Sequence, residues 1–151
     1  SLPGSVFARC RERMERPLPR VALGMALRGI ASAAADISDG LLGDMGHILR
    51  QSGVGAQLHV DACENLLACR HEIDLPASWR RTCTLSGGDD YELVFTAPPS
   101  RRSAVEQAAQ ISQTPVTRIG TITQAPGVEL LDAQSQRVTT RFASFDHFAQ
   151  D

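Results

Sequence analysis

The alternation of apolar and polar residues predicts helices and strands that follow one another along the chain. The clearest pattern starts at Leu41, where apolar residues recur at helical spacing until Gly53, a typical C-terminal cap. Residues 91–96 lie between a glycine turn and two prolines and are rich in β-formers, which predicts a strand. Helices are also predicted over 20–28, over 61–78 (irregular, with a loop at Pro76) and over 100–113, and strands over 30–37, 55–60, 116–123 and 128–131.

Some of these segments carry more specific expectations. The small residues of 30–37 favour a buried strand, although their alanines suit a helix equally well. Residues 124–127 are typical of a hairpin between the last two strands, and residues 137–139 suit an edge strand. The helix over 100–113 is expected to be capped by Ser100 and to turn inward Val105, Ala108, Ala109 and Ile111. The elements together predict an α+β domain, in which a mixed β-sheet is covered by helices.

Length and termini indicate how the domain is bounded. The 151 residues suit one hydrophobic core, and we expect residues 1–16 to be a linker or domain-start segment and residues 17–151 to be the domain. The chain begins without Met and without a signal pattern, so we expect a longer protein upstream. The apolar runs are too short for a membrane span.

Charge and cysteine usage remove several classes of function. A net charge of -2 is too balanced for a protein that binds nucleic acid electrostatically. All 15 basic residues are arginine, so lysine-dependent catalysis is excluded within these residues. Four cysteines without a C-x-x-C pair indicate a reducing, cytoplasmic setting. Cys63, Cys69 and His71 resemble half of a metal knuckle, but no second pair of ligands follows, which favours ordinary thiols.

The segment 36–40 lies where a strand should pass into the strongest helix. Asp36 and Asp39 can present carboxylates to a hard cation such as Mg²⁺, and the start of a helix attracts phosphate through its unpaired amides. Ser38 adds a hydroxyl that can bond a phosphate oxygen. The alternative is structural: Ser38 or Asp39 is only the N-cap of the helix, and Asp36 is a solvated residue at the end of a strand. The two carboxylates that flank a serine favour the functional interpretation over the structural one.

A second polar cluster, residues 86–91 (S-G-G-D-D-Y), precedes the strand at 91–96. Two adjacent aspartates that are both ionised usually have a cation or a ligand as partner. Taken alone, however, the segment is more typical of a sharp polar turn exposed to water.

The two clusters together resemble the C-terminal half of thiamine-monophosphate kinase. The resemblance rests on D-I-S-D-G-L at 36–41 and L-S-G-G-D-D-Y-E-L at 85–93, supported by Arg16 to Arg20, Ile119-Gly120 and F-D-H-F at 145–148. It covers nearly the whole chain and implies the C-terminal domain of the aminoimidazole ribonucleotide synthetase-like fold. Fold relatives such as selenophosphate synthetase and a hydrogenase-maturation protein lack this pairing of motifs.

The resemblance also implies an activity and roles for single residues. It implies transfer of the ATP γ-phosphoryl group to thiamine monophosphate with Mg²⁺, by a full-length homodimer whose N-terminal domain is absent from these residues. Asp36 and Asp39 would be Mg²⁺ ligands, Ser38 would contact ATP, and Asp89 and Phe145 would contact thiamine monophosphate. Asp89 stands where the family usually has Glu, and Phe145 could equally pack on the core. The alternatives are a related synthetase or maturation domain and a non-catalytic ligand-binding module.

Overall fold

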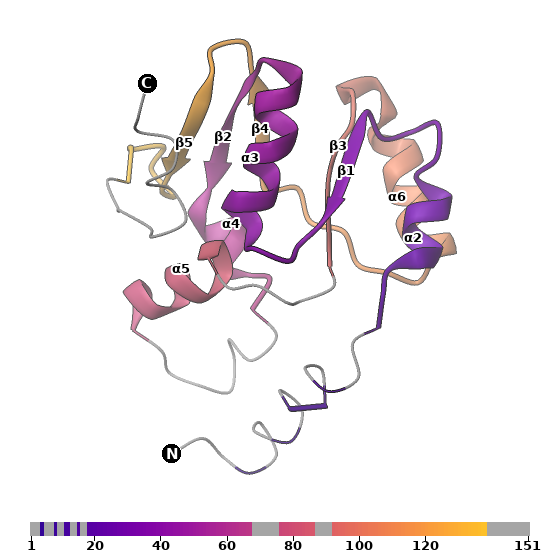
Figure 1. Ribbon diagram of the computed structural model, residues 1–151, viewed down its shortest axis with the longest axis horizontal. Helices are drawn as coiled ribbons and strands as arrows, with labels where there is room; N and C mark the ends of the chain where they lie inside the picture. The colour runs from indigo at the N-terminus through magenta and orange to yellow at the C-terminus, as the bar shows by residue number, and fades with distance from the viewer. Residues whose placement is uncertain are drawn as a thin grey trace.

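The computed structural model describes residues 18–67, 76–86 and 92–138, together with residues 4, 8, 11, 12 and 15. Helices and strands alternate along the described chain (Figure 1). In chain order the elements are α2 (Val21–Ala26), β1 (Ala33–Asp36), α3 (Leu41–Ser52), β2 (Gly55–His59), α4 (Val60–Glu64), α5 (Ala77–Ser86), β3 (Leu93–Thr96), the 3₁₀ turn η1 (Pro99–Arg101), α6 (Arg102–Ile111), β4 (Gly120–Thr123) and β5 (Gly127–Leu131). Within these residues no helix has the length and apolar character needed to cross a membrane.

The described residues of the N-terminal stretch 1–16 have helical backbone, although their sequence has no apolar period. Arg11 donates a hydrogen bond of 2.6 Å to Glu15, a pair with the i, i+4 spacing of an exposed helix.

The described strands form two sheets. In the first, β1 and β3 pair antiparallel, with Asp36 opposite Leu93. In the second, β2 lies between β4 and β5, antiparallel to β4 and parallel to β5. The second sheet is therefore mixed, and the predicted α+β class is confirmed.

The hairpin expected between the last two strands is wrong, because β2 separates them. The connection from β4 to β5 passes over the first residue of β2, Gly55. A Cβ atom at Gly55 would lie 2.0 Å from the carbonyl oxygen of Ala125 and 2.5 Å from that of Gly127. Only glycine permits this approach, so the missing side chain allows β4 and β5 to lie on the two sides of β2. The expected edge strand is reduced to one bridge, between Leu131 and Arg137.

Helix α3 packs against both sheets, as its predicted apolar face requires (Figure 1). Leu42 is fully buried on this face, and Gly53 ends the helix in the left-handed conformation, as predicted. The main core joins α3 to the second sheet, to α4 and α5 and to one face of β3 through the buried residues Leu41, Leu42, Met45, Leu49, Ala56, Leu58, Val60, Cys63, Leu85, Val94 and Leu130.

A smaller core lies on the other side of the β1–β3 ribbon. Leu23 and Leu27, in and just after α2, pack with Ala108 of α6. Along β3, Val94 belongs to the main core, whereas its neighbours Leu93 and Phe95 pack against the smaller one. The ribbon therefore lies between α3 and the pair formed by α2 and α6 (Figure 1).

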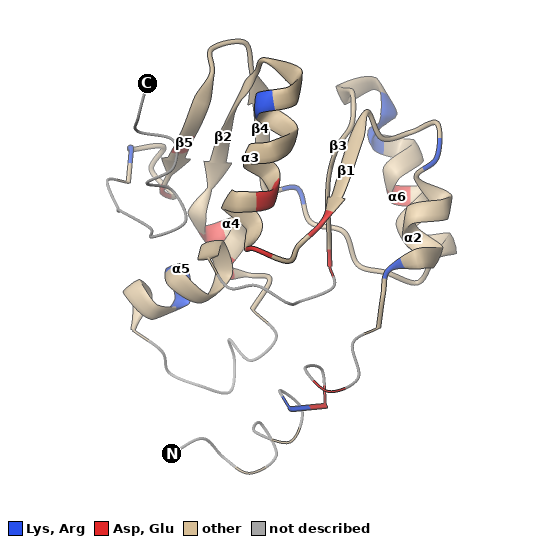
Figure 2. Ribbon diagram, viewed as in Figure 1, with Lys and Arg blue, Asp and Glu red and all other residues tan. Residues whose placement is uncertain are grey.

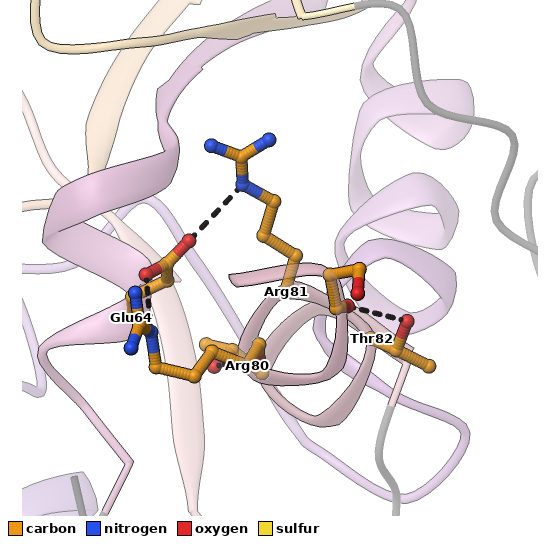
Figure 3. Close-up of polar contacts among 6 residues, drawn as sticks. Glu64, Arg80, Arg81 and Thr82 are labelled. Atoms are coloured by element: carbon orange, nitrogen blue, oxygen red, sulfur yellow. Dashed lines mark hydrogen bonds and ion pairs between the residues drawn. The ribbon is translucent and has the colours of Figure 1, made fainter. Parts of the chain in front are cut away.

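One helix prediction needs correction. Among the described residues, the span 61–78 that was expected to be an irregular helix holds most of the short α4 and the start of α5, which begins directly after Pro76. The amides of Trp79 and Arg80 donate to the Pro76 carbonyl, so this proline starts a helix rather than a loop. Figure 3 shows Glu64 of α4 accepting hydrogen bonds from Arg80 and Arg81 of α5, both of 3.1 Å. This double ion pair stabilises a helix whose own apolar pattern is weak.

Other predicted segments have the expected secondary structure but differ in burial or capping. The strand expected to be buried over 30–37 is β1, in which Ala33 and Ala35 are half-buried and Ala34 and Asp36 are exposed. Ser100 lies in η1 and is not the cap of α6. Ile111 was expected to face inward but is 79% exposed, because it is the last residue of α6 and nothing in the described structure covers it.

Candidate functional site at the start of α3

The first motif forms the connection from β1 to α3. Asp36 is the last residue of β1, and the side chains of Asp36, Ser38 and Asp39 are exposed. Gly40 precedes the helix with a φ of 100°, a conformation that favours glycine. Ser38 and Asp39 thus lie in an exposed loop before α3, as predicted, and Asp36 is an exposed residue at the end of a strand, as both interpretations of the motif expected.

Neither Ser38 nor Asp39 caps the helix. Gly40 occupies the N-cap position, and no side chain makes a cap hydrogen bond there. The structural alternative for these two residues, that one of them is only an N-cap, is therefore wrong. Their exposed side chains are available to a ligand, because folding of α3 does not use them.

Asp44, a residue that the sequence analysis did not single out, holds this loop in place. Its side chain is buried, and Oδ2 accepts hydrogen bonds from the backbone amides of Ser38 (2.8 Å) and Asp39 (3.0 Å). These two amides precede the N-cap Gly40, so they are not the helix-start amides that were expected to attract phosphate, and the carboxylate of Asp44 occupies both. An aspartate on the polar side of a helix's first turn is the signal that could have shown this anchor.

The second motif meets the first at Gly40. Gly40 is buried, and a Cβ atom there would lie 3.0 Å from the Cα and carbonyl carbon of Ser86, the last residue of α5. The positive φ and this close approach both require glycine. The loop of the first motif therefore packs directly on the residue at which the second motif begins.

The other end of the second motif is joined to the same loop. The amide of Ile37 donates a 2.9 Å hydrogen bond to the carbonyl oxygen of Glu92, which extends the β1–β3 pairing beyond Asp36. The side chain of Glu92 accepts two hydrogen bonds from Arg20, of 2.9 and 2.7 Å. These hydrogen bonds hold the pKa of the Arg20 guanidinium above its ordinary value, although partial burial acts in the opposite direction.

A largely apolar hollow of about 490 Å³ lies beside Asp36. Its lining residues come from α2, from the residues just before and after it and from the end of the ribbon, and include Arg20, Val21, Met25, Arg28, Asp36 and Leu93. Asp36 thus lies between an exposed polar loop and a surface that can accommodate an apolar group.

Negative charge gathers at this end of the ribbon. Figure 2 shows acidic residues at the end of β1, in the following loop, at the start of α3 and just before β3. Exposed carboxylate oxygens are the ligands that Mg²⁺ prefers, and Mg²⁺ is commonly held by one or two carboxylates together with water and phosphate oxygens. Among the described residues no group of three or more acidic, histidine or cysteine side chains could hold a metal alone. As metal ligands, Asp36 and Asp39 would therefore need further ligands from outside the described residues, such as water or phosphate oxygens.

The remaining candidates of the sequence analysis are settled only in part. Asp89 and Phe145 lie outside the described residues, as do Cys69 and His71. Cys63 is fully buried, and burial, together with the charge of Glu64, raises the pKa of its thiol to about 12. A thiol with this pKa stays protonated near neutral pH, so Cys63 behaves as a core residue rather than a metal ligand.

Comparisons with known proteins show which proteins the chain is similar to. The chain is 42% identical over 139 residues to a thiamine-monophosphate kinase of Salmonella typhimurium, covering 91% of this chain and 42% of that protein. The crystal structure of a thiamine-monophosphate kinase from Stenotrophomonas maltophilia matches with 40% identity and a TM-score of 0.70, over 86% of this chain and 41% of that one. A structure of AaThiL complexed with AMPPCP and TMP matches with 26% identity and a TM-score of 0.65, over 93% of this chain and 42% of that one.

The chain therefore spans about two fifths of the length of the relatives that it matches. A family model described as AIR synthase related protein, C-terminal domain, matches residues 8–133 and so includes the first motif, both described ends of the second and both sheets. With more than half of its residues matched, the chain belongs to the family of AIR synthase related protein C-terminal domains.

Proposed function

We propose that this chain is the C-terminal domain of a thiamine-monophosphate kinase. The full-length protein would transfer the γ-phosphoryl group of ATP to the phosphate of thiamine monophosphate, giving thiamine diphosphate and ADP. In this step an oxygen of the acceptor phosphate bonds to the γ-phosphorus while the bond from that phosphorus to the bridging oxygen of ADP breaks.

One observation carries the proposal: the first motif packs on both described ends of the second. Gly40 contacts Ser86, and the amide of Ile37 donates a hydrogen bond to the carbonyl of Glu92, so the loop that carries Ser38 and Asp39 is joined to the two described residues that flank the segment with Asp89. The relatives support the same reading, because two of them are thiamine-monophosphate kinases and a third was solved with AMPPCP, an ATP analogue, and TMP.

In the proposed mechanism this chain contributes ligands and orientation. Asp36 and Asp39 would hold Mg²⁺, and the hydroxyl of Ser38, which lies between them in sequence, would contact ATP. The metal, when bound, would supply positive charge to the phosphate oxygens. Because Asp44 occupies the amides of Ser38 and Asp39, these two amides are not free to bind the triphosphate.

The remaining assignments come from the resemblance. Asp89 and Phe145 would contact thiamine monophosphate, Asp89 with a carboxylate one methylene shorter than the usual glutamate. An N-terminal domain of the same protein would supply the other metal ligands and most of the nucleotide site, in a cytoplasmic homodimer. We therefore expect the 151-residue segment alone to have no kinase activity.

The proposal is tested by incubating the full-length protein with ATP, Mg²⁺ and thiamine monophosphate and measuring thiamine diphosphate and ADP by chromatography. We expect equal amounts of the two products and none without Mg²⁺. Thiamine monophosphate that binds but is never phosphorylated would contradict the kinase and favour a ligand-binding module. ATP hydrolysis without thiamine diphosphate would favour a related synthetase.

A further inference from the structure

The carboxylate of Asp44 is buried, accepts two hydrogen bonds and has no role in the proposed chemistry. We propose that Asp44 is a positioning residue that fixes the loop between β1 and α3, so that the carboxylates of Asp36 and Asp39 bind a divalent cation together. What the cation does afterwards rests on the proposed function, whereas the positioning itself does not.

Two hydrogen bonds tie the side chain of Asp44 to the loop. Oδ2 accepts from the amides of Ser38 and Asp39, at 2.8 and 3.0 Å. The amide of Asp44 donates to the carbonyl of Gly40 at 3.0 Å, as the first backbone hydrogen bond of α3. The loop backbone is thereby fixed from within α3, while the side chains of Ser38 and Asp39 remain exposed.

The side-chain acceptor of Asp44 also limits what the loop amides can bind. Without it, the amides of Ser38 and Asp39 would be free to bind an anion. With it, both amides are occupied, and the oxygen of an asparagine side chain would occupy them in the same way.

A role as a metal ligand would predict a different result on substitution of Asp44. If Asp44 were itself a metal ligand, its charge would matter and asparagine would be as damaging as alanine. As a positioning residue it needs an acceptor for two amides, and both hydrogen bonds end on the single oxygen Oδ2. The side-chain oxygen of asparagine has two lone pairs and can accept both.

The protein offers a matched control in Asp132, which follows β5. Its Oδ1 also accepts two backbone amides, those of Gln134 (2.9 Å) and Gln136 (2.8 Å). Asp132 thus makes the same kind of contact in the turn after β5, and both of its bonds stay within that turn. Asp132→Ala should loosen its own turn and leave the candidate site unchanged.

The test compares full-length wild type, Asp44→Asn, Asp44→Ala and Asp132→Ala by two measurements that need no turnover. One is hydrogen exchange of the peptide that contains Ser38 and Asp39, and the other is calorimetric titration with Mg²⁺ alone. Substituting a residue that orients metal ligands typically weakens metal affinity by about 10- to 100-fold. We expect a loss in this range, with faster exchange, for Asp44→Ala, and values within about threefold of wild type for Asp44→Asn and Asp132→Ala.

Each outcome decides the matter. Wild-type Mg²⁺ affinity in Asp44→Ala would overturn the proposal, and so would an equal loss in the asparagine and alanine variants. Should Asp44→Ala not fold, Asp44→Ser replaces it, because its hydroxyl can bond within the helix but is too short to reach both amides. If the wild type makes no thiamine diphosphate, the proposed function fails, and exchange and titration still test the role of Asp44.

Discussion

The two sheets differ in what their residues do. In the β4–β2–β5 sheet, Ala56, Leu58 and Leu130 are buried in the main core. In the β1–β3 ribbon every second residue of β1 is exposed, and the strand ends at the polar loop 37–40. Stability thus resides mainly in the three-stranded sheet with α3, and ligand chemistry at one end of the ribbon. Substitutions in the two regions should therefore change different measured quantities.

The largest effect is expected from a substitution at the end of the ribbon. It should lower turnover and leave stability nearly unchanged. Asp39→Asn in the full-length protein should lower kcat for thiamine diphosphate formation by about 10³-fold, because one ligand to the cations is lost in the transition state. The melting temperature should change little, because the Asp39 side chain is exposed and makes no cap bond. An unfolded Asp39→Asn variant would show that this residue serves the fold instead.

The opposite result is expected in the three-stranded sheet. Leu58→Ala removes a side chain that is 2% exposed and should lower the free energy of unfolding by about 3 kcal/mol, since it leaves a cavity in the main core. The protein that remains folded should keep its wild-type kcat. Urea titration measures the first quantity, and an assay at a temperature where the variant is folded measures the second. A large fall in kcat would contradict the assignment of stability to one sheet and of ligand chemistry to the other.

Gly40→Ala should affect both quantities, because Gly40 lies where the ribbon loop contacts α5. Alanine is strained at a φ of 100°, and its Cβ would lie 3.0 Å from Ser86 backbone atoms. We expect a loss of about 1–3 kcal/mol in the free energy of unfolding and a fall in kcat in the folded fraction. Gly53→Ala is the control: Gly53 also has a positive φ, but a Cβ there meets nothing within 4 Å. Its stability loss should be smaller, with no change in kcat.

A smaller effect is expected from the ion pair that holds the ribbon to α2. Arg20 and Glu92 are 26% and 32% exposed and share two hydrogen bonds, so a double-mutant cycle with Arg20→Gln and Glu92→Gln should give a coupling of about 1 kcal/mol. The exposed pair Arg11–Glu15 should give only about 0.3 kcal/mol in the same measurement. Equal coupling energies for the two pairs would mean that partial burial does not strengthen the Arg20–Glu92 pair.

The smallest effect concerns the buried thiol of the main core. Because the pKa of Cys63 is raised to about 12, the folded state keeps a proton that the unfolded state loses as pH rises past 9.0. This contribution is complete below pH 9.0 and is lost as pH rises toward 12. Between pH 8 and 9 the wild type should lose about 0.4 kcal/mol more stability than Cys63→Ala. Parallel pH profiles for the two proteins would contradict the raised pKa.

The sequence predicted local features well and non-local ones poorly. Helix α3 has a strong apolar period and a C-cap, Gly53, that is readable from its residue type, so it was found with nearly correct ends. The position of β2 between β4 and β5 could not be predicted from the local sequence, because Gly55 contacts the connection between β4 and β5 only in the folded chain. α5 was missed because much of its support comes from Glu64 on another helix.

Part of the candidate site could likewise be predicted from the sequence, and part of it could not. The carboxylates of Asp36 and Asp39 and the hydroxyl of Ser38 were predicted from an acidic motif at a strand–helix junction, and they are exposed there. The anchoring by Asp44 was missed, because a polar residue in a helix usually signals a solvated position. Its burial depends on how the loop folds back over the first turn of α3, which residue types alone do not reveal.

The placement of β2 also bears on how the chain reaches this structure. Gln57 of β2 pairs with Glu129 of β5, and Ala56 pairs with Ile122 of β4, so both ladders join residues far apart in sequence. Such a sheet cannot grow from a local hairpin, and closing the long intervening loops costs entropy before any contact stabilises it. We therefore expect slow folding limited by the docking of β4 and β5 around β2. A bulkier residue at Gly55 should slow this step more than substitutions in the ribbon do.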